Sequence, residues 1–355
     1  MVIRGQAPLR ISFAGGGTDL PAYSEPHGGA TISTTIDKWI YGTLIPSDGN
    51  LVRVYSVDYD VLVEYDLDQP IADQETHLEL FSAILERLAP ERGFDLYIES
   101  DAPVGTGLGS SGALTALVVA LVDDYLALRS SSYDLAETAF EISRSIQGIN
   151  VGRQDEYAAV FGGVNFMEFA KGRPNVIPLR LAPWIVGELE YHAVLCYTQK
   201  RRLPEFAVNE HIQRLLAGRD DTARALARQR ELAYEVRDHL LQGDIPAVAD
   251  KLHQAGLAKQ QMNPNAVPDV VLNLYEAARQ AGARGGKLLG AGGGGYLFLL
   301  CGFGCKGAVI EALESAGGQV VPVHLEQHGV LTWRVPDVNF PKGHPLTRPP
   351  NATDG

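Results

Sequence analysis

A glycine- and serine-rich run, PVGTGLGSSGA (103–113), limits what this chain can fold into more than any other feature. It follows FDLYIES (94–100), which predicts a strand, and it leads into an apolar segment, Ala113 to Leu128, that predicts a buried helix. Four glycines allow a tight backbone path, and the start of a helix offers unpaired N–H groups and a positive dipole end. The run therefore predicts a phosphate-binding loop in a mixed α/β domain.

Two common nucleotide-binding patterns do not fit this run. It lacks the Lys of GxxxxGK[ST], and Gly105, Gly107 and Ser110 break the GxGxxG register at the last position. A dinucleotide-dependent oxidoreductase is disfavoured because GGGTDLP (15–21), after the first predicted strand, does not fit GxGxxG, and the best glycine loop lies past residue 100. The plain alternative, a glycine turn capped by one serine, rarely uses four glycines. We therefore interpret the run as a phosphate loop of another kind.

Length and charge narrow the remaining classes. A chain of 355 residues usually divides between two cores, and the pattern of elements changes near residue 185. We expect an N-terminal domain over 1–185, a C-terminal domain over 186–335, and a disordered tail over 336–355. The net charge of −13 argues against nucleic-acid or anionic-membrane partners. Three cysteines, with no apolar leader or membrane-length run, predict a cytoplasmic protein, and a monomer and a homodimer both remain open.

Hydrophobic spacing predicts the other elements of an α+β protein. Strands are expected over 2–14, 30–46, 51–66, 161–169, 177–181, 194–197 and 319–325, and helices over 77–89, 134–147, 204–262, 267–282 and 306–316. SDGN (47–50) predicts a hairpin turn between its flanking strands.

Four motifs resemble those of the family of galactokinase, homoserine kinase, mevalonate kinase and phosphomevalonate kinase, the GHMP kinases. The run 103–113 resembles the family's ATP-binding loop, and PLRISFAGGGTDLPAY (8–23) is similar to the substrate-side motif of heptose-phosphate and fucose kinases. GGKLLGAGGGGYLFLL (285–300) resembles the C-terminal glycine motif, and GRQDEYAAVFGG (152–163) the segment with the catalytic Asp. The order of the four motifs extends the resemblance to about Leu325.

The resemblance implies a two-domain α+β fold with a ribosomal-protein-S5-like N-terminal domain and a ferredoxin-like C-terminal domain. ATP would bind between the domains, together with Mg²⁺. The residues implied for ATP are Pro103, Gly105, Gly107, Leu108, Gly109, Ser110, Ser111 and Gly112, and Ser111 is also implied as a metal ligand.

The resemblance also implies the catalytic pair. Asp155 would accept the proton of a sugar hydroxyl as it attacks the γ-phosphate. Arg10 would pair with Asp155, keep it ionised and steady the transferred phosphate. A surface Asp and a strand-edge Arg are the plain alternatives.

The substrate residues implied by the resemblance come from both domains. They are Gly16, Gly17, Thr18 and Asp19 in the first domain, and Gly292 and Gly293, flanked by Gly290 and Gly294, in the second. An Asx-type turn would equally explain Thr18 and Asp19. The cluster Lys200, Arg201 and Arg202 would bind a phosphate already on the substrate, and Arg153 and Lys287 would serve likewise; a solvated charge run is the alternative.

One position departs from the family. Many members carry a Glu in the helix before the catalytic Asp, which holds Mg²⁺ with the second Ser of the loop. In EISRSIQGINVGRQD (141–155) this position holds Ser143, and Glu141 should point to another face of the helix. The metal site would then rest on Ser111 and the phosphates, unless Glu141 moves in with a shifted register.

The implied function is an ATP-dependent kinase for the anomeric hydroxyl of a sugar phosphate, first of all D-glycero-D-manno-heptose 7-phosphate, giving the 1,7-bisphosphate. Kinases for fucose or a C7-cyclitol phosphate remain open. So does a non-catalytic sugar and ATP sensor, which Ser143 alone supports.

Overall fold

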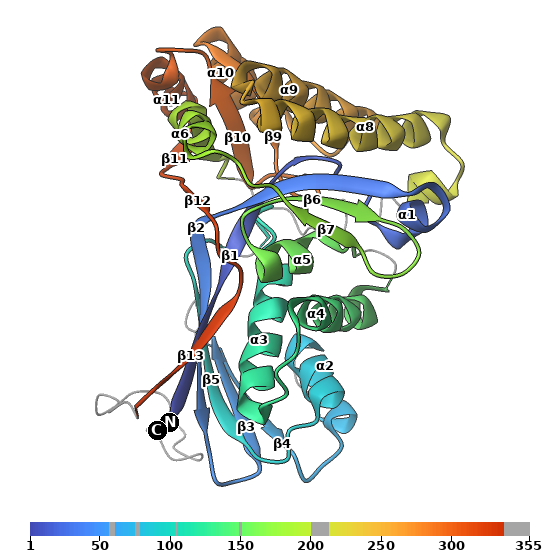
Figure 1. The fold of residues 1–355 in the computed structure, drawn as a ribbon, viewed down its shortest axis with the longest axis vertical. Coiled ribbons are helices and arrows are strands. Elements are labelled where there is room, and N and C mark those ends of the chain that lie inside the picture. Colours follow the sequence, from blue (N-terminus) through green and yellow to red (C-terminus); the bar gives the residue numbers. More distant parts are fainter. Residues whose placement is uncertain (57–60, 75–78, 104, 149–150, 200–212, 337–355) are drawn as a thin grey trace.

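Two β-sheets organise the molecule, one in each half (Figure 1). The computed structural model describes residues 1–355 except 57–60, 75–78, 104, 149–150, 200–212 and 337–355. The predicted disordered tail therefore lies almost wholly outside the described residues. The predicted α+β class is confirmed, because helices and mainly antiparallel strands alternate through both halves.

The first sheet has the strand order β13-β1-β2-β5-β3-β4, with β12 and β6 pairing with β2 and β7 pairing with β6. Its strands are β1 (Val2–Ala14), β2 (Gly29–Pro46), β3 (Leu51–Ser56), β4 (Val61–Asp66), β5 (Phe94–Ser100), β6 (Val164–Phe169), β7 (Asn175–Pro178), β12 (Leu325–Glu326) and β13 (Leu331–Val335). β1 and β2 are long because their apolar residues continue through both halves of the molecule, and most of their positions are buried.

Helices cover one face of this sheet (Figure 1). They are α2 (Glu79–Leu88), α3 (Ser110–Leu126), α4 (Ser132–Gln147) and α5 (Gln154–Phe161), with the short α1 (Pro21–His27) and a 3-10 turn (Ile71–Asp73) at the periphery. α3 is apolar on nearly every side because β1 and β2 lie against one side and α4 and α5 against the other.

The second sheet has the order β11-β8-β10-β9, with every pair antiparallel. Its strands are β8 (Ala193–Tyr197), β9 (Ala283–Leu288), β10 (Tyr296–Cys301) and β11 (Gln319–Val321); its helices are α6 (Pro183–His192), α8 (Asp220–Gln242), α9 (Ile245–Met262), α10 (Asp269–Gln280) and α11 (Lys306–Ser315). α10 and α11 share an apolar cluster with one face of this sheet. The chain order of strands and helices is the ferredoxin-like pattern that we expected.

Two expectations about pairing and domain limits are wrong. SDGN (47–50) does not join a hairpin, because β5 lies between β2 and β3, and the loop instead crosses Gly93, whose missing side chain allows Leu51 to approach. The segment 325–335, which we placed in the second domain, forms β12 and β13 in the first sheet. Short strands that return to a distant sheet carry no local pattern that would reveal their partner.

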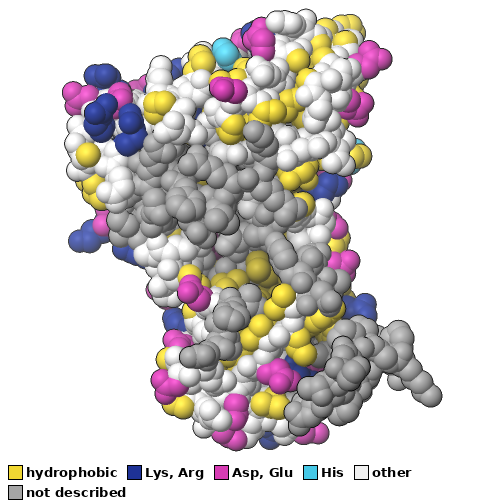
Figure 2. Space-filling model, turned by 180° about the vertical axis from the view of Figure 1, so that it is seen from behind, with side chains coloured by type: hydrophobic (Ala, Val, Ile, Leu, Met, Phe, Trp, Pro, Cys, Tyr) yellow, Lys and Arg dark blue, Asp and Glu magenta, His cyan; other side chains and the backbone are white. Residues whose placement is uncertain are grey.

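One hydrophobic core joins the two halves. A single apolar cluster runs from β1 and α3 to α8, α9 and β10. On the face drawn in Figure 2, acidic and basic side chains are interspersed over the described surface. Within the described part of the chain, no helix has the length and apolar character needed to cross a bilayer.

Candidate active site

The predicted phosphate loop ends where α3 begins, with no side-chain cap. The N-cap residue is Gly109, which has φ +73° and no side chain to bond the first-turn N–H groups. Those groups are therefore available to an anion at the positive end of a buried helix. Ser110 is buried in this first turn, whereas Ser111 is exposed. Before the turn, the hydroxyl of Thr106 donates to the carbonyl of Pro103 at 2.7 Å and closes the loop.

Arg10 connects this loop to Asp155, as predicted. Its Nε and Nη2 lie 2.8 and 2.7 Å from the same Asp155 oxygen, Oδ1, and its Nη1 donates to the Gly107 carbonyl at 2.6 Å. The Arg10 backbone N–H donates to the Leu108 carbonyl at 2.9 Å. The Arg10 side chain is 5% exposed and that of Asp155 is 31% exposed, so the arginine is fixed and the carboxylate reaches solvent.

Asp155 comes close to the loop because α5 packs against the first turn of α3. A Cβ added to Gly112 would lie 2.6 Å from the Cβ of Asp155 and 3.0 Å from the backbone N of Glu156. Only glycine permits this approach of the two helix starts. The sequence predicted neither α5 nor this contact.

The loop after β1 brings Asp19 to the same place. Asp19 is 2% exposed and accepts hydrogen bonds from the backbone N–H of Gly17 and from both the backbone N–H and the side chain of Gln154, at 3.1–3.2 Å. Burial, together with the charge of Asp155, raises the pKa of Asp19 to about 6. A carboxylate of this kind is poised to accept a hydrogen bond from a sugar hydroxyl.

The three residues before Asp19 have different surroundings. The Thr18 hydroxyl donates to the carbonyls of Gly15 and Ala30 and accepts from the Ala30 N–H, so it ties the loop to β2 instead of facing a ligand. Gly17 lies against Leu226 and Met262 of the second half. Gly16 has only the end of the Gln154 side chain near its Cβ position, so it leaves the most room for a sugar.

The second glycine turn meets the first across the two halves. A Cβ on Gly290 would lie 2.4 Å from the Cα of Gly107, and one on Gly295 would lie 2.2 Å from the Thr106 carbonyl. Gly292 and Gly293 instead pack against Ala266, where the Gly293 N–H donates to the Ala266 carbonyl at 2.7 Å. The contact between the two loops thus rests on Gly290 and Gly295, and the substrate role expected of Gly292 and Gly293 stays a prediction.

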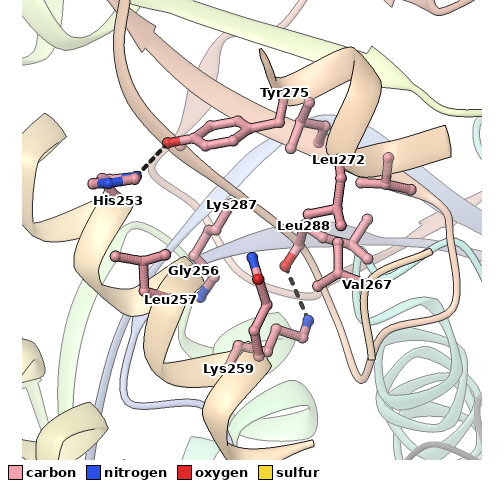
Figure 3. A pocket seen from close by; sticks show the side chains of 13 residues that line it. His253, Gly256, Leu257, Lys259, Val267, Leu272, Tyr275, Lys287 and Leu288 are labelled. Atoms are coloured by element: carbon pink, nitrogen blue, oxygen red, sulfur yellow. Dashed lines mark hydrogen bonds between the residues drawn. The ribbon is translucent and has the colours of Figure 1, made fainter. Parts of the chain in front are cut away.

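Two buried lysines donate hydrogen bonds to backbone carbonyls at and near these loops. Lys259 donates to the carbonyls of Leu288 and Gly290, at 3.0 and 2.5 Å, and Lys287 donates to the Phe13 carbonyl at 3.3 Å. Burial lowers the pKa of Lys287 to about 7, assisted by the charge of Arg10, and burial also holds the pKa of Lys259 well below its usual range. Both lysines also line a hollow between α9, α10 and β9 (Figure 3).

Arg153, a further basic residue predicted for the substrate, does not join this group. Arg153 pairs with Glu137 at 2.9 Å, and its guanidinium lies 4.4 Å above the ring of Phe140, because the start of α5 directs it towards α4. The cluster Lys200, Arg201 and Arg202 lies outside the described residues.

Glu156 is a buried carboxylate beside Ser143, the position of the missing Glu. Its side chain has an oxygen, Oε2, without a hydrogen-bond partner among the described residues, and Ser143 is the side chain that hydrogen-bonds to it. Burial, followed by the charge of Asp155, raises the pKa of Glu156 to about 7. Glu141, the alternative, is half exposed and pairs with Arg87 at 3.4 Å. A shifted register of α4 is therefore wrong.

These residues fit a divalent cation that arrives with a nucleotide. Mg²⁺ is commonly held by one or two carboxylates together with substrate phosphates and water. In the described part of the chain, no three His, Cys, Asp or Glu side chains form a metal cluster by themselves. Such a site needs only one or two ligands from the protein. Glu156, whose Oε2 has no hydrogen-bond partner among the described residues, and Ser111 in the first turn of α3 match that number.

Gln154, Glu156 and Lys259 were missed by sequence reasoning. Gln154 and Glu156 flank Asp155, but without α5 their directions were unknown. Lys259 stands among Ala255, Ala258 and Met262 on the buried side of α9, and a lysine on an apolar helix face is the signal that was available.

Comparisons with known proteins agree with this geometry. Family models for the GHMP kinases N terminal domain and the GHMP kinases C terminal region match residues 76–163 and 236–319. A D-glycero-alpha-D-manno-heptose 7-phosphate kinase of Campylobacter jejuni is 32% identical over 94% of this chain and 99% of its own length. The bifunctional fucokinase/GDP-fucose pyrophosphorylase of Arabidopsis thaliana is 25% identical over 83% of this chain and 29% of its own length. The crystal structure of a D-glycero-D-manno-heptose 1-phosphate kinase from Bacteroides thetaiotaomicron has a TM-score of 0.76 and 27% identity, and it covers 94% of this chain and 100% of that one.

Proposed function

This chain belongs to the GHMP kinase family, and on that premise we propose that it transfers the γ-phosphate of ATP to the anomeric hydroxyl of a sugar phosphate. The first substrate that we propose is D-glycero-D-manno-heptose 7-phosphate, because the Campylobacter jejuni relative, which is named as a kinase of such a compound, aligns over nearly the whole of both chains. The products would be the 1,7-bisphosphate and ADP.

The observation that carries the proposal is the ion pair of Arg10 and Asp155 at the end of the glycine loop. The sugar oxygen would attack the γ-phosphorus, a new O–P bond would form, and the bond from that phosphorus to the β-phosphate oxygen would break. The hydroxyl proton would pass to Asp155, whose carboxylate is the partly exposed member of the pair. Arg10 would hold this carboxylate in place and offset negative charge near the transferred phosphate.

ATP would lie with its phosphates on the start of α3, where Gly109 leaves the first-turn N–H groups uncapped. Ser111 is the loop residue that we propose for Mg²⁺, which when bound neutralises charge on the phosphates. Asp19 and the open backbone at Gly16 would receive the sugar ring. The proposal that Lys200, Arg201 and Arg202 bind the phosphate already on the sugar rests on the sequence alone.

ADP release from Mg·ATP tests the proposal when a panel of acceptors is added to purified protein. The panel contains heptose 7-phosphate, sedoheptulose 7-phosphate, a cyclitol 7-phosphate and fucose. We expect release with heptose 7-phosphate and loss of release in Asp155→Asn, with ATP affinity kept within a few-fold. ADP release with fucose alone would support the kinase activity but would contradict a sugar phosphate as the substrate. ATP binding without release for any acceptor would favour a sugar and ATP sensor.

A further inference from the structure

We propose that Glu156 supplies the carboxylate of the divalent-cation site in this chain, from α5, in place of the position on α4 that holds Ser143. The inference rests on the proposed function, since the cation would arrive with the nucleotide. It assigns a ligand that the glycine loop alone does not provide.

Burial and missing partners single out Glu156. Its side chain is 2% exposed, and its Oε2 lacks a hydrogen-bond partner among the described residues. The main neighbouring charges that act on it come from two further carboxylates, Asp155 and Asp19, and Arg10 is already paired with Asp155. A buried carboxylate is costly unless a cation or a full set of donors compensates it. A cation bound beside Glu156 would provide the missing positive charge.

The position of Glu156 connects it to the loop. Its backbone N lies 3.0 Å from the Cβ position of Gly112, in the first turn of α3. Its hydrogen-bonding neighbour Ser143 lies 3.5 Å from the hydroxyl of Thr115, which in turn donates to the Ser111 carbonyl at 3.0 Å. The carboxylate therefore lies beside Ser143, whose hydroxyl is close to Thr115, one helical turn along α3 from Ser111.

Mn²⁺ binding to the ADP complex tests this directly. ADP affinity is first measured without metal, and Mn²⁺ is then titrated into the protein–ADP complex by electron paramagnetic resonance. Three variants are compared with the wild type. They are Glu156→Gln, the exchange Ser143→Glu/Glu156→Gln, and Glu141→Gln, which removes the same charge from an exposed position on α4.

We expect Glu156→Gln to weaken Mn²⁺ binding at least tenfold with metal-free ADP affinity retained. The exchange variant should return to within about threefold of the wild type, and Glu141→Gln should not change. Unaltered Mn²⁺ affinity in Glu156→Gln would overturn the inference. A loss that the exchange variant does not restore would also overturn it, because it would indicate a structural role. Failure of the wild type to bind ADP would overturn the proposed function, and the inference with it.

Discussion

Arg10 joins the phosphate loop to Asp155 through its guanidinium and its backbone N–H. It reaches the catalytic candidate Asp155, the carbonyl of Gly107 in the phosphate loop, and through its backbone the carbonyl of Leu108. A planar guanidinium can donate to Asp155 and to the Gly107 carbonyl at the same time, whereas an ammonium lacks this fixed arrangement of N–H groups. The residue therefore acts as a geometric link as well as a charge.

Arg10→Lys tests this link. We expect kcat to fall about 10- to 100-fold, since Asp155 would lose its fixed orientation. ATP affinity should fall less, because the start of α3 remains intact. Steady-state ADP release with heptose 7-phosphate and equilibrium ATP binding measure the two effects. Equal losses in both would contradict a role in orienting Asp155.

The raised pKa of Asp19 makes the stability of the protein depend on pH. Its pKa rises from 3.8 to about 6 on folding, so the folded protein binds this proton more tightly than the unfolded chain. The associated stability is complete below the unfolded pKa and is lost as the pH rises through the folded pKa, so ionised Asp19 costs stability at neutral pH. The free energy of unfolding of Asp19→Asn relative to that of the wild type should therefore be higher at pH 7 than at pH 4, by about 2 kcal/mol. Urea unfolding at both pH values measures this gain, and an equal difference at both would refute it.

At the scale of elements, the site depends on how closely two glycine turns approach. Gly290 has φ +64°, and its Cβ position lies 2.4 Å from the Cα of Gly107, so both conformation and space exclude a side chain. Gly172 has a similar left-handed backbone, with φ +99°, but open space around it. Comparing a substitution at Gly290 with one at Gly172 therefore distinguishes the effect of backbone strain from the effect of losing the contact between the turns.

Gly290→Ala should destabilise the protein by about 3 kcal/mol and weaken ATP binding at least tenfold, because the turns must separate. Gly172→Ala, as the matched control, should cost about 1 kcal/mol and leave ATP binding unchanged. Thermal unfolding and ATP titration measure both. Similar ATP affinities for the two variants would show that the approach of the turns does not shape the site.

The sequence predicted those elements whose pattern is local. The phosphate loop with α3, the helices α4 and α10, and the long β1 all have clear periodicity or glycine spacing. The pair of Arg10 and Asp155 was available only through family resemblance, because 145 residues separate the two. β5 between β2 and β3, and Glu156 beside Ser143, could not be predicted, since both depend on contacts between distant segments. α5 was missed because its eight residues lack a strong apolar face.

At the scale of the whole molecule, the two halves are not independent. Their apolar cluster is continuous from α3 to α9, and after β11 the chain returns to the first sheet as β12 and β13. β13 pairs with β1 along five residue pairs and covers an edge that would otherwise be open. The returning segment therefore ties the second half to the first.

Truncation tests this closure. A chain ending at residue 324 should unfold at a clearly lower temperature than one ending at residue 336, because it loses β12, β13 and their pairing. Both truncated chains lack 337–355, so the comparison isolates the returning strands. The longer chain should unfold in one transition by circular dichroism and by tryptophan fluorescence. Two separated transitions, or equal midpoints for the two chains, would contradict a shared core.

We propose above that this chain forms a second phosphate ester at the anomeric carbon of a sugar phosphate, with Asp155 as base. Phosphorus NMR of a reaction containing Mg·ATP and D-glycero-D-manno-heptose 7-phosphate tests it most directly. We predict a new phosphate signal coupled to the anomeric proton, equal in amount to the ADP formed, and no such signal with Asp155→Asn. ADP accompanied only by inorganic phosphate would contradict transfer to the sugar, and a new ester formed equally by Asp155→Asn would contradict Asp155 as the base.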